Sequence, residues 1–195
     1  MKKIDVKTKK LFDLEETIAK SLFEKYTYPW EVFKELGSFI EEIGATLPDT
    51  EYLKIGKNIW VHRSVKIMPT IALAGPLIIG KDASIRSCAF FRGNVIIGEG
   101  AVAGNSCEFK NAILFNKAQV PHFSYVGDSI IGYKAHLGAS AITSIRPVSS
   151  GRISGESATN RISYIVILII FFGALTTTLS GSRSKKNFSI SRYIK

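Results

Sequence analysis

A six-residue apolar period runs through the middle of this chain and restricts its possible folds more than any other feature. Every sixth residue from Ile55 to Phe109 is apolar. With hydrophobic residues at 46% of the chain, such a run has a chance probability on the order of 0.0004. A second apolar series, in which small residues become frequent, lies two positions earlier in each unit. The first series is Ile55, Val61, Ile67, Leu73, Ile79, Ile85, Phe91, Ile97, Ala103 and Phe109, and the second is Leu53, Ile59, Val65, Ile71, Leu77, Ala83, Ala89, Val95, Ala101 and Cys107.

This spacing predicts an all-β fold, a left-handed parallel β-helix. A period of six with apolar, small and glycine positions is typical of hexapeptide repeats, in which each hexad forms one short strand and a turn. Three hexads close a triangular coil, and successive coils stack their inward side chains because no coil can bury its own face. An α-helix repeats about every 3.6 residues and an alternating strand about every 2, so neither explains the pattern.

The period continues beyond Phe109 with two shortened steps. Leu114 and Ile131 each follow the preceding apolar position by five residues instead of six, and the pattern reaches Leu137 before it ends. We therefore predict a β-helix over residues 51–144, with about five coils of ~18 residues each.

Residues 1–50 are predicted to form a helical leader in front of the β-helix. Apolar residues recur there at helical spacing, and Asp13 followed by Glu16 suits a capped helix start. This pattern predicts a first helix. The sequence Tyr28-Pro29-Trp30 interrupts it, because proline lacks the backbone N–H group that would donate a helical hydrogen bond. A second helix is expected from Trp30 to Ile43, with one apolar side that needs a surface to pack against.

The net charge of +10 belongs mainly to residues 145–195. That segment holds 8 Lys and Arg against 1 acid, whereas residues 1–144 hold 18 against 15. Since the β-helix itself has no basic groove with interleaved aromatics, we expect no nucleic-acid partner. Cys88 and Cys107 form no CxxC motif, which argues against a zinc or redox site. The basic N-terminus is not followed by an apolar segment, so we expect no secretory signal and a cytoplasmic protein.

Residues 145–195 lack the six-residue period and form an atypical basic and apolar tail. An uncharged stretch of 21 residues, 162–182, reaches the length needed to span a bilayer. Three interpretations remain: a membrane anchor, a packed element that covers the open end of the β-helix, or a C-terminus replaced through a shifted reading frame. The abrupt change in composition without a linker favours the third, so membrane contact through 162–182 is not the favoured interpretation.

His122 is the histidine best suited to catalysis. It falls between two inward positions, so it should point outward, and Pro121 fixes the backbone beside it. Histidine ordinarily titrates near neutral pH and is a common general base; the alternative interpretation of this segment is an exposed polar turn. His62 and His136 have no obvious partner nearby in sequence and are expected to be solvated or structural.

Two motifs in the second half of the β-helix carry a family resemblance. They are Gly-Asn-Ser-Cys-Glu-Phe-Lys-Asn-Ala-Ile-Leu at 104–114 and His-Phe-Ser-Tyr-Val-Gly-Asp-Ser-Ile-Ile-Gly at 122–132. Both resemble the acetyltransferase domain of the bifunctional N-acetylglucosamine-1-phosphate uridyltransferase/glucosamine-1-phosphate acetyltransferase family of hexapeptide-repeat acyltransferases. The resemblance spans about residues 53–144. The leader is more similar to that of short stand-alone sugar-nucleotide pyrophosphorylase-related proteins.

The resemblance implies a reaction and its residues. His122 matches the base that takes a proton from the sugar amine as the amine attacks the acetyl thioester, and Glu108 matches an acid near it. Acetyl-CoA is the implied co-substrate, acetyl transfer needs no metal, and the family's sites lie between subunits, so a homotrimer is expected. Arg92 and Lys110 match the cations that bind the phosphate or uridyl side of the sugar nucleotide. Tyr125 matches a hydroxyl that contacts phosphate, and Asn105 matches an asparagine whose role is open.

The sequence also departs from the family pattern. His136 stands where the family has an asparagine that contacts substrate, and Ala139 and Ser140 replace part of a glycine-bearing stretch at the acetyl-CoA edge. The later coils and the uridylyltransferase domain are expected to be absent. We therefore expect acetyl transfer to an amino sugar phosphate in sugar-nucleotide synthesis, with impaired turnover. The alternatives are a non-catalytic sugar-nucleotide-binding or scaffold protein and a sugar-phosphate nucleotidyltransferase-related subunit.

Overall fold

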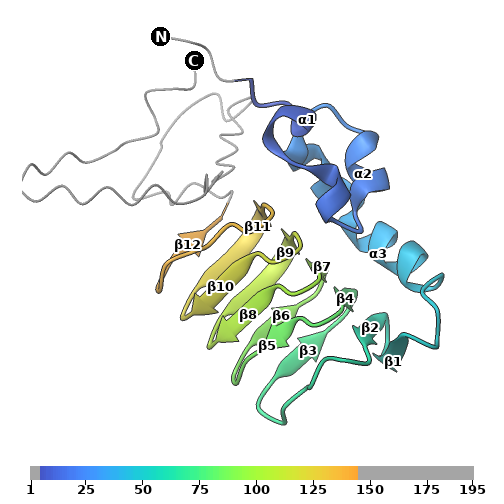
Figure 1. The fold of residues 1–195 in the computed structure, drawn as a ribbon, viewed down its shortest axis with the longest axis vertical. Helices are drawn as coiled ribbons and strands as arrows, with labels where there is room; N and C mark the ends of the chain where they lie inside the picture. The colour runs from blue at the N-terminus through green and yellow to red at the C-terminus, as the bar shows by residue number, and fades with distance from the viewer. Residues whose placement is uncertain (1–4, 145–195) are drawn as a thin grey trace, which may run out of the picture.

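Short strands stack into a solenoid in the computed structural model, which describes residues 5–144 (Figure 1). Strands of successive coils pair in parallel, and about five coils result, which confirms the predicted β-helix. Its left-handed sense stays a prediction, and the interpretations of residues 145–195 lie outside the described residues. The strands are β1 (Tyr52–Gly56), β2 (Ile59–His62), β3 (Ala72–Ala74), β4 (Leu77–Ile79), β5 (Ser84–Ile85), β6 (Phe90–Arg92), β7 (Val95–Ile97), β8 (Val102–Asn105), β9 (Glu108–Leu114), β10 (Gln119–His122), β11 (Tyr125–Ile131) and β12 (Ile142–Thr143).

Three faces surround the interior of the coil. The first face consists of β2, β4, β7 and the C-terminal halves of β9 and β11. The second face consists of β5, β8 and β10. The third face consists of β3, β6, β12 and the N-terminal halves of β9 and β11. The long strands β9 and β11 therefore run around a corner from the third face into the first.

Residues with positive φ mark the three corners of the coil. They recur in three columns with φ between 46° and 61°, where the left-handed backbone turns the chain from one face to the next. The repeat along a column is 18 residues in the early coils and 17 in the later ones, which confirms the two shortened steps of the apolar period. We call the columns the Asn corner (Asn58, Asn94, Asn111, Asp128), the Lys corner (Asp82, Gly100, Lys117, Lys134) and the Ser corner (Cys88, Ser106, Phe123, Ser140).

The two apolar series fill the interior of the coil from Ile59 to Leu137. Phe91 and Phe109 are fully buried, with ring centroids 5.2 Å apart and ring planes 15° apart. Small residues such as Ala101 directly follow a corner, where a tight turn leaves little room. Each coil therefore buries its interior side chains against those of its neighbours, as the period predicts.

The start of the β-helix differs from the prediction. Leu53 and Ile55, the first members of the two series, are 41% and 48% exposed. β1 pairs antiparallel with β2, so this hairpin strand is not one rung of a parallel coil. The interior begins at Ile59, and the predicted boundary at residue 51 comes too early because an apolar period does not encode the direction in which a strand pairs.

The leader consists of short helical pieces rather than the two helices predicted. Thr17 is extended, and its hydroxyl accepts a hydrogen bond from the backbone amide of Ala19, which breaks the first predicted helix. Asp13 does cap a helical turn, through the amide of Glu15. The pieces are α1 (Thr8–Leu11), η1 (Leu14–Glu16), α2 (Lys20–Glu24), η2 (Pro29–Lys34) and α3 (Leu36–Gly44).

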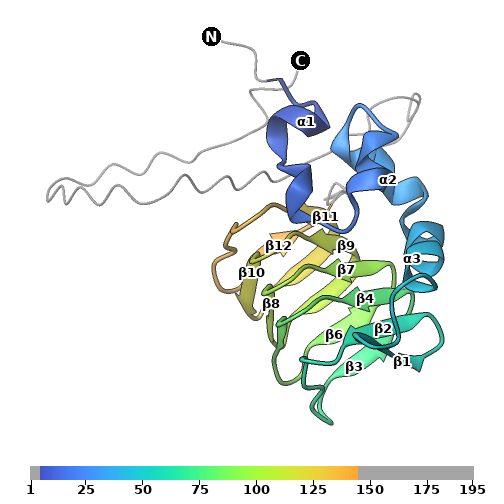
Figure 2. The same cartoon turned by 45° about the vertical axis from the view of Figure 1, so that its right-hand side comes forward.

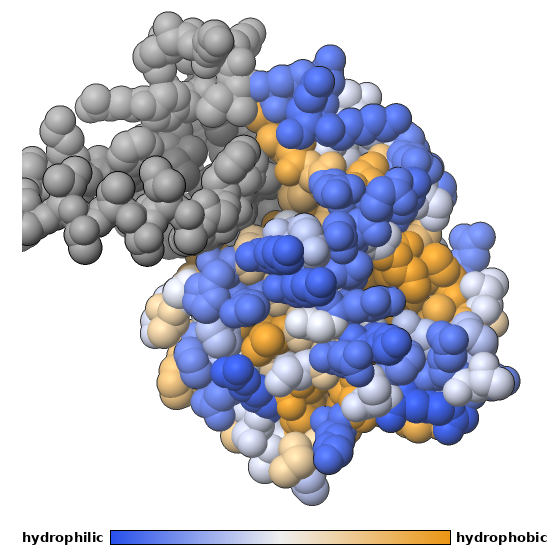
Figure 3. Space-filling view, in the orientation of Figure 1, coloured by the Kyte–Doolittle hydropathy of each residue, from blue (hydrophilic) through white to orange (hydrophobic). Residues whose placement is uncertain are grey.

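The leader packs against the first face, along the strands of successive coils (Figure 2). Phe12 and Phe23 contact Phe115 at ring-centroid distances of 5.2 and 5.5 Å. On the side seen in Figure 3 the surface is mostly polar, with apolar patches over both the leader and the β-helix. The leader therefore buries the outward apolar ladder of the first face, which is Trp60, Ile78, Ile96, Ile113 and Ile130.

A Thr17→Val variant is expected to lower the free energy of unfolding by about 1–2 kcal/mol. The change keeps the shape of the side chain but leaves the fully buried amide of Ala19 without its acceptor. Urea unfolding followed by circular dichroism measures the loss. Thr46→Val is the matched control, because the exposed Thr46 hydroxyl only donates to a helix-end carbonyl. Equal losses in the two variants would contradict the role given to Thr17.

Candidate functional site

The third face carries four of the predicted site residues: Arg92, Glu108, Lys110 and Tyr125. Glu108 in β9 is in register with Tyr125 in β11, so the two lie side by side on the outer surface. Arg92 in β6 and Lys110 in β9 occupy equivalent positions on adjacent strands, each one residue after an inward phenylalanine. The hexapeptide period therefore brings these four residues together from three successive coils.

Arg92 and Glu108 form an ion pair on this face. Nη1 of Arg92 lies 2.7 Å from Oε1 of Glu108, and their side chains are 45% and 34% exposed. The hydrogen bond that Arg92 donates to Glu108, and then the negative charge of Glu108, raise the pKa of Arg92. Lys110 is exposed and forms no ion pair within residues 5–144. Arg92 and Lys110 thus differ, since the guanidinium of Arg92 is already paired with the carboxylate of Glu108.

His122 lies on the second face, beside the Ser corner. It ends β10 and is in register with Asn105, which ends β8. The residue is exposed, and its backbone oxygen accepts a hydrogen bond of 3.2 Å from the amide of Ser140 in the next coil. His122 and Asn105 therefore lie on the second-face side of the Ser corner, and Ser140 lies at the corner itself. Tyr125 begins the third face on the other side.

The predicted residues consequently form two groups on adjacent faces. A ligand shared by His122 and Arg92 would have to lie across the Ser corner, where the side chain of Phe123 is 61% exposed. The hydrogen-bond partner of the Glu108 carboxylate within residues 5–144 is Arg92, not His122. Within the described residues the Glu108 carboxylate is therefore paired across the third face and not with the imidazole of His122.

The remaining predicted residues lie near the last described coil. Nδ1 of His136 lies 3.2 Å from Oε1 of Gln119, on the second face. Ala139 and Ser140 are exposed at the Ser corner, one coil after His122. These positions extend the second-face group rather than the cationic group on the third face.

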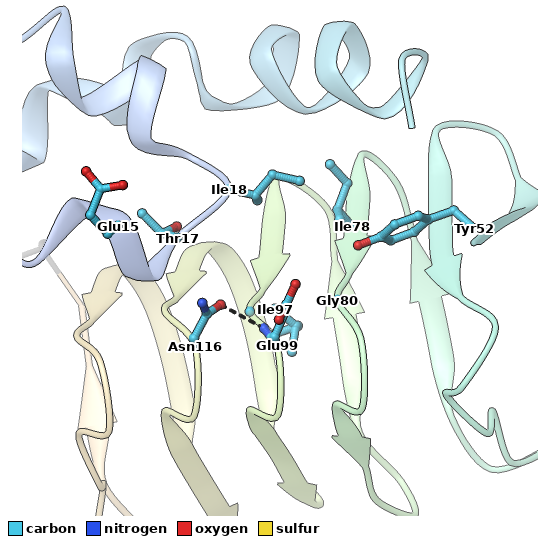
Figure 4. Close-up of a pocket in the computed structure, with 10 residues that line it drawn as sticks. Glu15, Thr17, Ile18, Tyr52, Ile78, Gly80, Ile97, Glu99 and Asn116 are labelled. Atoms are coloured by element: carbon cyan, nitrogen blue, oxygen red, sulfur yellow. Dashed lines mark hydrogen bonds between the residues drawn. The ribbon is translucent and has the colours of Figure 1, made fainter. Parts of the chain in front are cut away.

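A pocket of about 230 Å³ lies elsewhere, between the leader and the first face (Figure 4). Glu15 of the leader and Tyr52 and Glu99 of the β-helix help to line it, and none of the predicted site residues does. Burial, and then the charge of Glu99, raise the pKa of Tyr52. No sequence motif points to this pocket, because segments far apart in the chain meet there. Its Glu15 carboxylate is already paired with Lys20.

Within residues 5–144, no group of three or more His, Cys, Asp or Glu side chains could hold a metal ion. None of the helices in this range has the length and apolar character needed to cross a membrane. Cys107 is buried in the coil interior, and this burial raises the pKa of its thiol, which disfavours the nucleophilic thiolate.

Comparison with known proteins gives matches to part of this chain. Residues 73–166 match the family model of the GMPPB C-terminal domain. The bifunctional protein GlmU of Methanococcus vannielii is 30% identical over 117 residues, which cover 59% of this chain and 28% of the relative. GlmU of Methanococcus aeolicus is 33% identical over 121 residues, with coverages of 59% and 28%. GlmU of Acaryochloris marina is 30% identical over 115 residues, with coverages of 56% and 24%.

These relatives are much longer than the region they share with this chain, which spans less than a third of their length. Their names agree with the family to which the motifs at 104–114 and 122–132 point. The chain is therefore similar to the bifunctional GlmU proteins, and the resemblance predicted from its sequence motifs is confirmed.

Proposed function

We propose that this chain is a hexapeptide-repeat N-acetyltransferase, which moves an acetyl group from acetyl-CoA to the amine of an amino sugar phosphate in sugar-nucleotide synthesis. The observation that carries the proposal is the placement of Arg92 and Lys110 on adjacent strands of the third face, which lies across the Ser corner from the second face that carries His122. Two neighbouring cations suit a phosphate group, since each can donate to a different oxygen. The similarity to GlmU proteins supports the reaction class.

His122 is the proposed general base. An ammonium group has no free electron pair, so the sugar amine must lose a proton before it can attack a thioester. The imidazole of His122 would accept that proton while the amine nitrogen bonds to the acetyl carbon and the thiolate of coenzyme A leaves. Asn105 is in register with His122 and would contact the sugar, and Ala139 and Ser140 would border the acetyl-CoA side.

Acetyl transfer to glucosamine 1-phosphate tests the proposal directly. The purified full chain is incubated with acetyl-CoA and the sugar phosphate, and release of the free coenzyme A thiol is followed over time. Unphosphorylated glucosamine is the matched substrate control, because it lacks the group that Arg92 and Lys110 would bind. Equal rates with both sugars would contradict the phosphate-binding part of the proposal.

A Lys110→Gln variant is expected to raise KM for glucosamine 1-phosphate about tenfold and to leave kcat nearly unchanged. Lys110 would bind the phosphate equally well before and during the reaction, so its loss weakens binding rather than chemistry. Lys81→Gln removes the same charge at an exposed position beside the Lys corner and serves as the control. A similar rise of KM in Lys81→Gln would mean that overall charge, and not a local contact, binds the substrate.

The proposal includes a homotrimer in the cytoplasm. His122 and the cations of the third face lie on adjacent faces, so a neighbouring subunit that packs along the Ser corner would close a site between them. Analytical ultracentrifugation measures the assembly, and a monomer at assay concentration would remove the shared site from the proposal.

A non-catalytic sugar-nucleotide-binding protein is the second candidate function. The observation in its favour is that Arg92 and Lys110, the proposed phosphate-binding cations, lie on adjacent strands, whereas Ala139 and Ser140 depart from the family's acetyl-CoA edge. Calorimetry with a uridine diphosphate sugar and with coenzyme A separates the two functions. Binding of the sugar nucleotide alone favours the binding protein, and binding of both favours the enzyme.

A further inference from the structure

The ion pair between Arg92 and Glu108 occupies part of the place proposed for the phosphate. Nη1 of Arg92 and Oε1 of Glu108 are 2.7 Å apart, so the carboxylate occupies an N–H donor of the guanidinium that a ligand would use. The neighbours of Glu108 in its outward ladder are Phe90 and Tyr125, and neither carries a positive charge. Arg92 is thus the one salt-bridge partner of Glu108 within residues 5–144.

We propose that Glu108 is a built-in competitor for the phosphate site, which holds Arg92 until a dianionic ligand displaces its carboxylate and thereby determines which anions bind. This inference rests on the proposed function, because it takes the phosphate of the sugar substrate as the ligand of Arg92 and Lys110. Glu108 acts through Arg92 and is therefore a positioning residue that sets specificity.

The charges on the third face explain the selectivity. Arg92 and Lys110 carry two positive charges, and Glu108 neutralises one of them. A monoanionic carboxylate ligand would only replace one carboxylate with another and would gain no charge. A phosphate dianion brings more charge and three acceptor oxygens, so it can contact both cations at once.

The exchange is feasible because the ion pair is partly exposed. Its side chains are 45% and 34% exposed, and ion pairs in such positions contribute little to folding. Arg92 can therefore release Glu108 without loss of the fold. The displaced carboxylate remains nearby and repels every bound anion, so binding requires a ligand that gains enough from contacts with both Arg92 and Lys110 to offset this repulsion.

Calorimetric titration of the full chain with inorganic phosphate and, separately, with acetate tests this inference. Glu108→Gln keeps the size of the side chain and removes its charge. We expect this variant to bind phosphate about fivefold more tightly than the unmodified chain, as loss of one surface ion pair would allow. Binding of acetate is expected to strengthen by no more than binding of phosphate, because both anions displace the same carboxylate and the repulsion by Glu108 grows with the charge of the ligand. The matched control is Glu99→Gln, an exposed acid beside the Lys corner, which should change neither affinity.

Two results would overturn the inference. One is a Glu108→Gln variant that binds phosphate no more tightly than the unmodified chain, including the case in which neither binds. The other is an equal gain in Glu99→Gln, which would indicate a general effect of net charge. This experiment measures phosphate binding and not acetyl transfer. If the chain shows no turnover but Glu108→Gln still binds phosphate more tightly, the proposed enzyme activity is refuted and the inference on Glu108 is supported.

Discussion

A His122→Ala variant is expected to lower kcat for acetyl transfer about 100- to 10,000-fold, because the sugar amine loses its general base. The exposed side chain of His122 ends β10, and its backbone rather than its ring receives the hydrogen bond from Ser140. Removal of the ring should therefore leave the coil intact. Initial rates of thiol release, measured at saturating acetyl-CoA and sugar phosphate, give the change in kcat.

His62→Ala is the control for this experiment. His62 ends β2 on the first face, and its Nδ1 lies 2.8 Å from the hydroxyl of Ser64. Its loss should change kcat less than about twofold, because it lies on a different face from His122. A shallower dependence of the rate on pH in His122→Ala than in His62→Ala would add a signature that a structural role cannot produce. Equal rates for the two variants would remove His122 from the mechanism.

The stacked interior could be predicted from sequence because it depends on a strictly local rule. Each inward position of a coil lies over the equivalent position of the next, so Phe91 meets Phe109 and the period records that contact directly. The rule does not extend to strand direction, which is why Leu53 fits the series and yet lies exposed in an antiparallel hairpin. The break of the leader at Thr17 was missed because it depends on one side-chain hydrogen bond.

The repeat also predicts which residues of the candidate site lie close together, but not how their side chains interact. The same register that aligns Phe91 with Phe109 places Arg92 beside Lys110, so their proximity follows from the repeat. The ion pair of Arg92 with Glu108 does not follow from it, because it depends on side-chain conformation across two coils. The separation of His122 onto the second face depends on the turn at Phe123, whose φ of 48° no apolar period encodes.

A Phe109→Ala variant is expected to lower the free energy of unfolding by about 3–5 kcal/mol, the largest loss of stability that we predict. Phe109 is fully buried and stacks on Phe91 with ring centroids 5.2 Å apart. The parallel strands on either side of β9 fix the backbone, so the coil cannot collapse to fill the cavity. Urea unfolding, followed by circular dichroism in the strand region, measures the loss as a lower midpoint at constant slope.

Phe90→Ala tests whether burial within the coil, rather than loss of an aromatic ring, causes this effect. Phe90 lies on the adjacent strand of the same face but points outward and is 43% exposed. Its replacement should cost less than about 1 kcal/mol, because much of its ring contacts water in the folded chain. Equal losses in the two variants would mean that Phe109 does not fill a stacked interior. The alternation that directs Phe109 inward also directs Arg92, Glu108 and Lys110 outward, so that result would remove the geometric basis of the phosphate site as well.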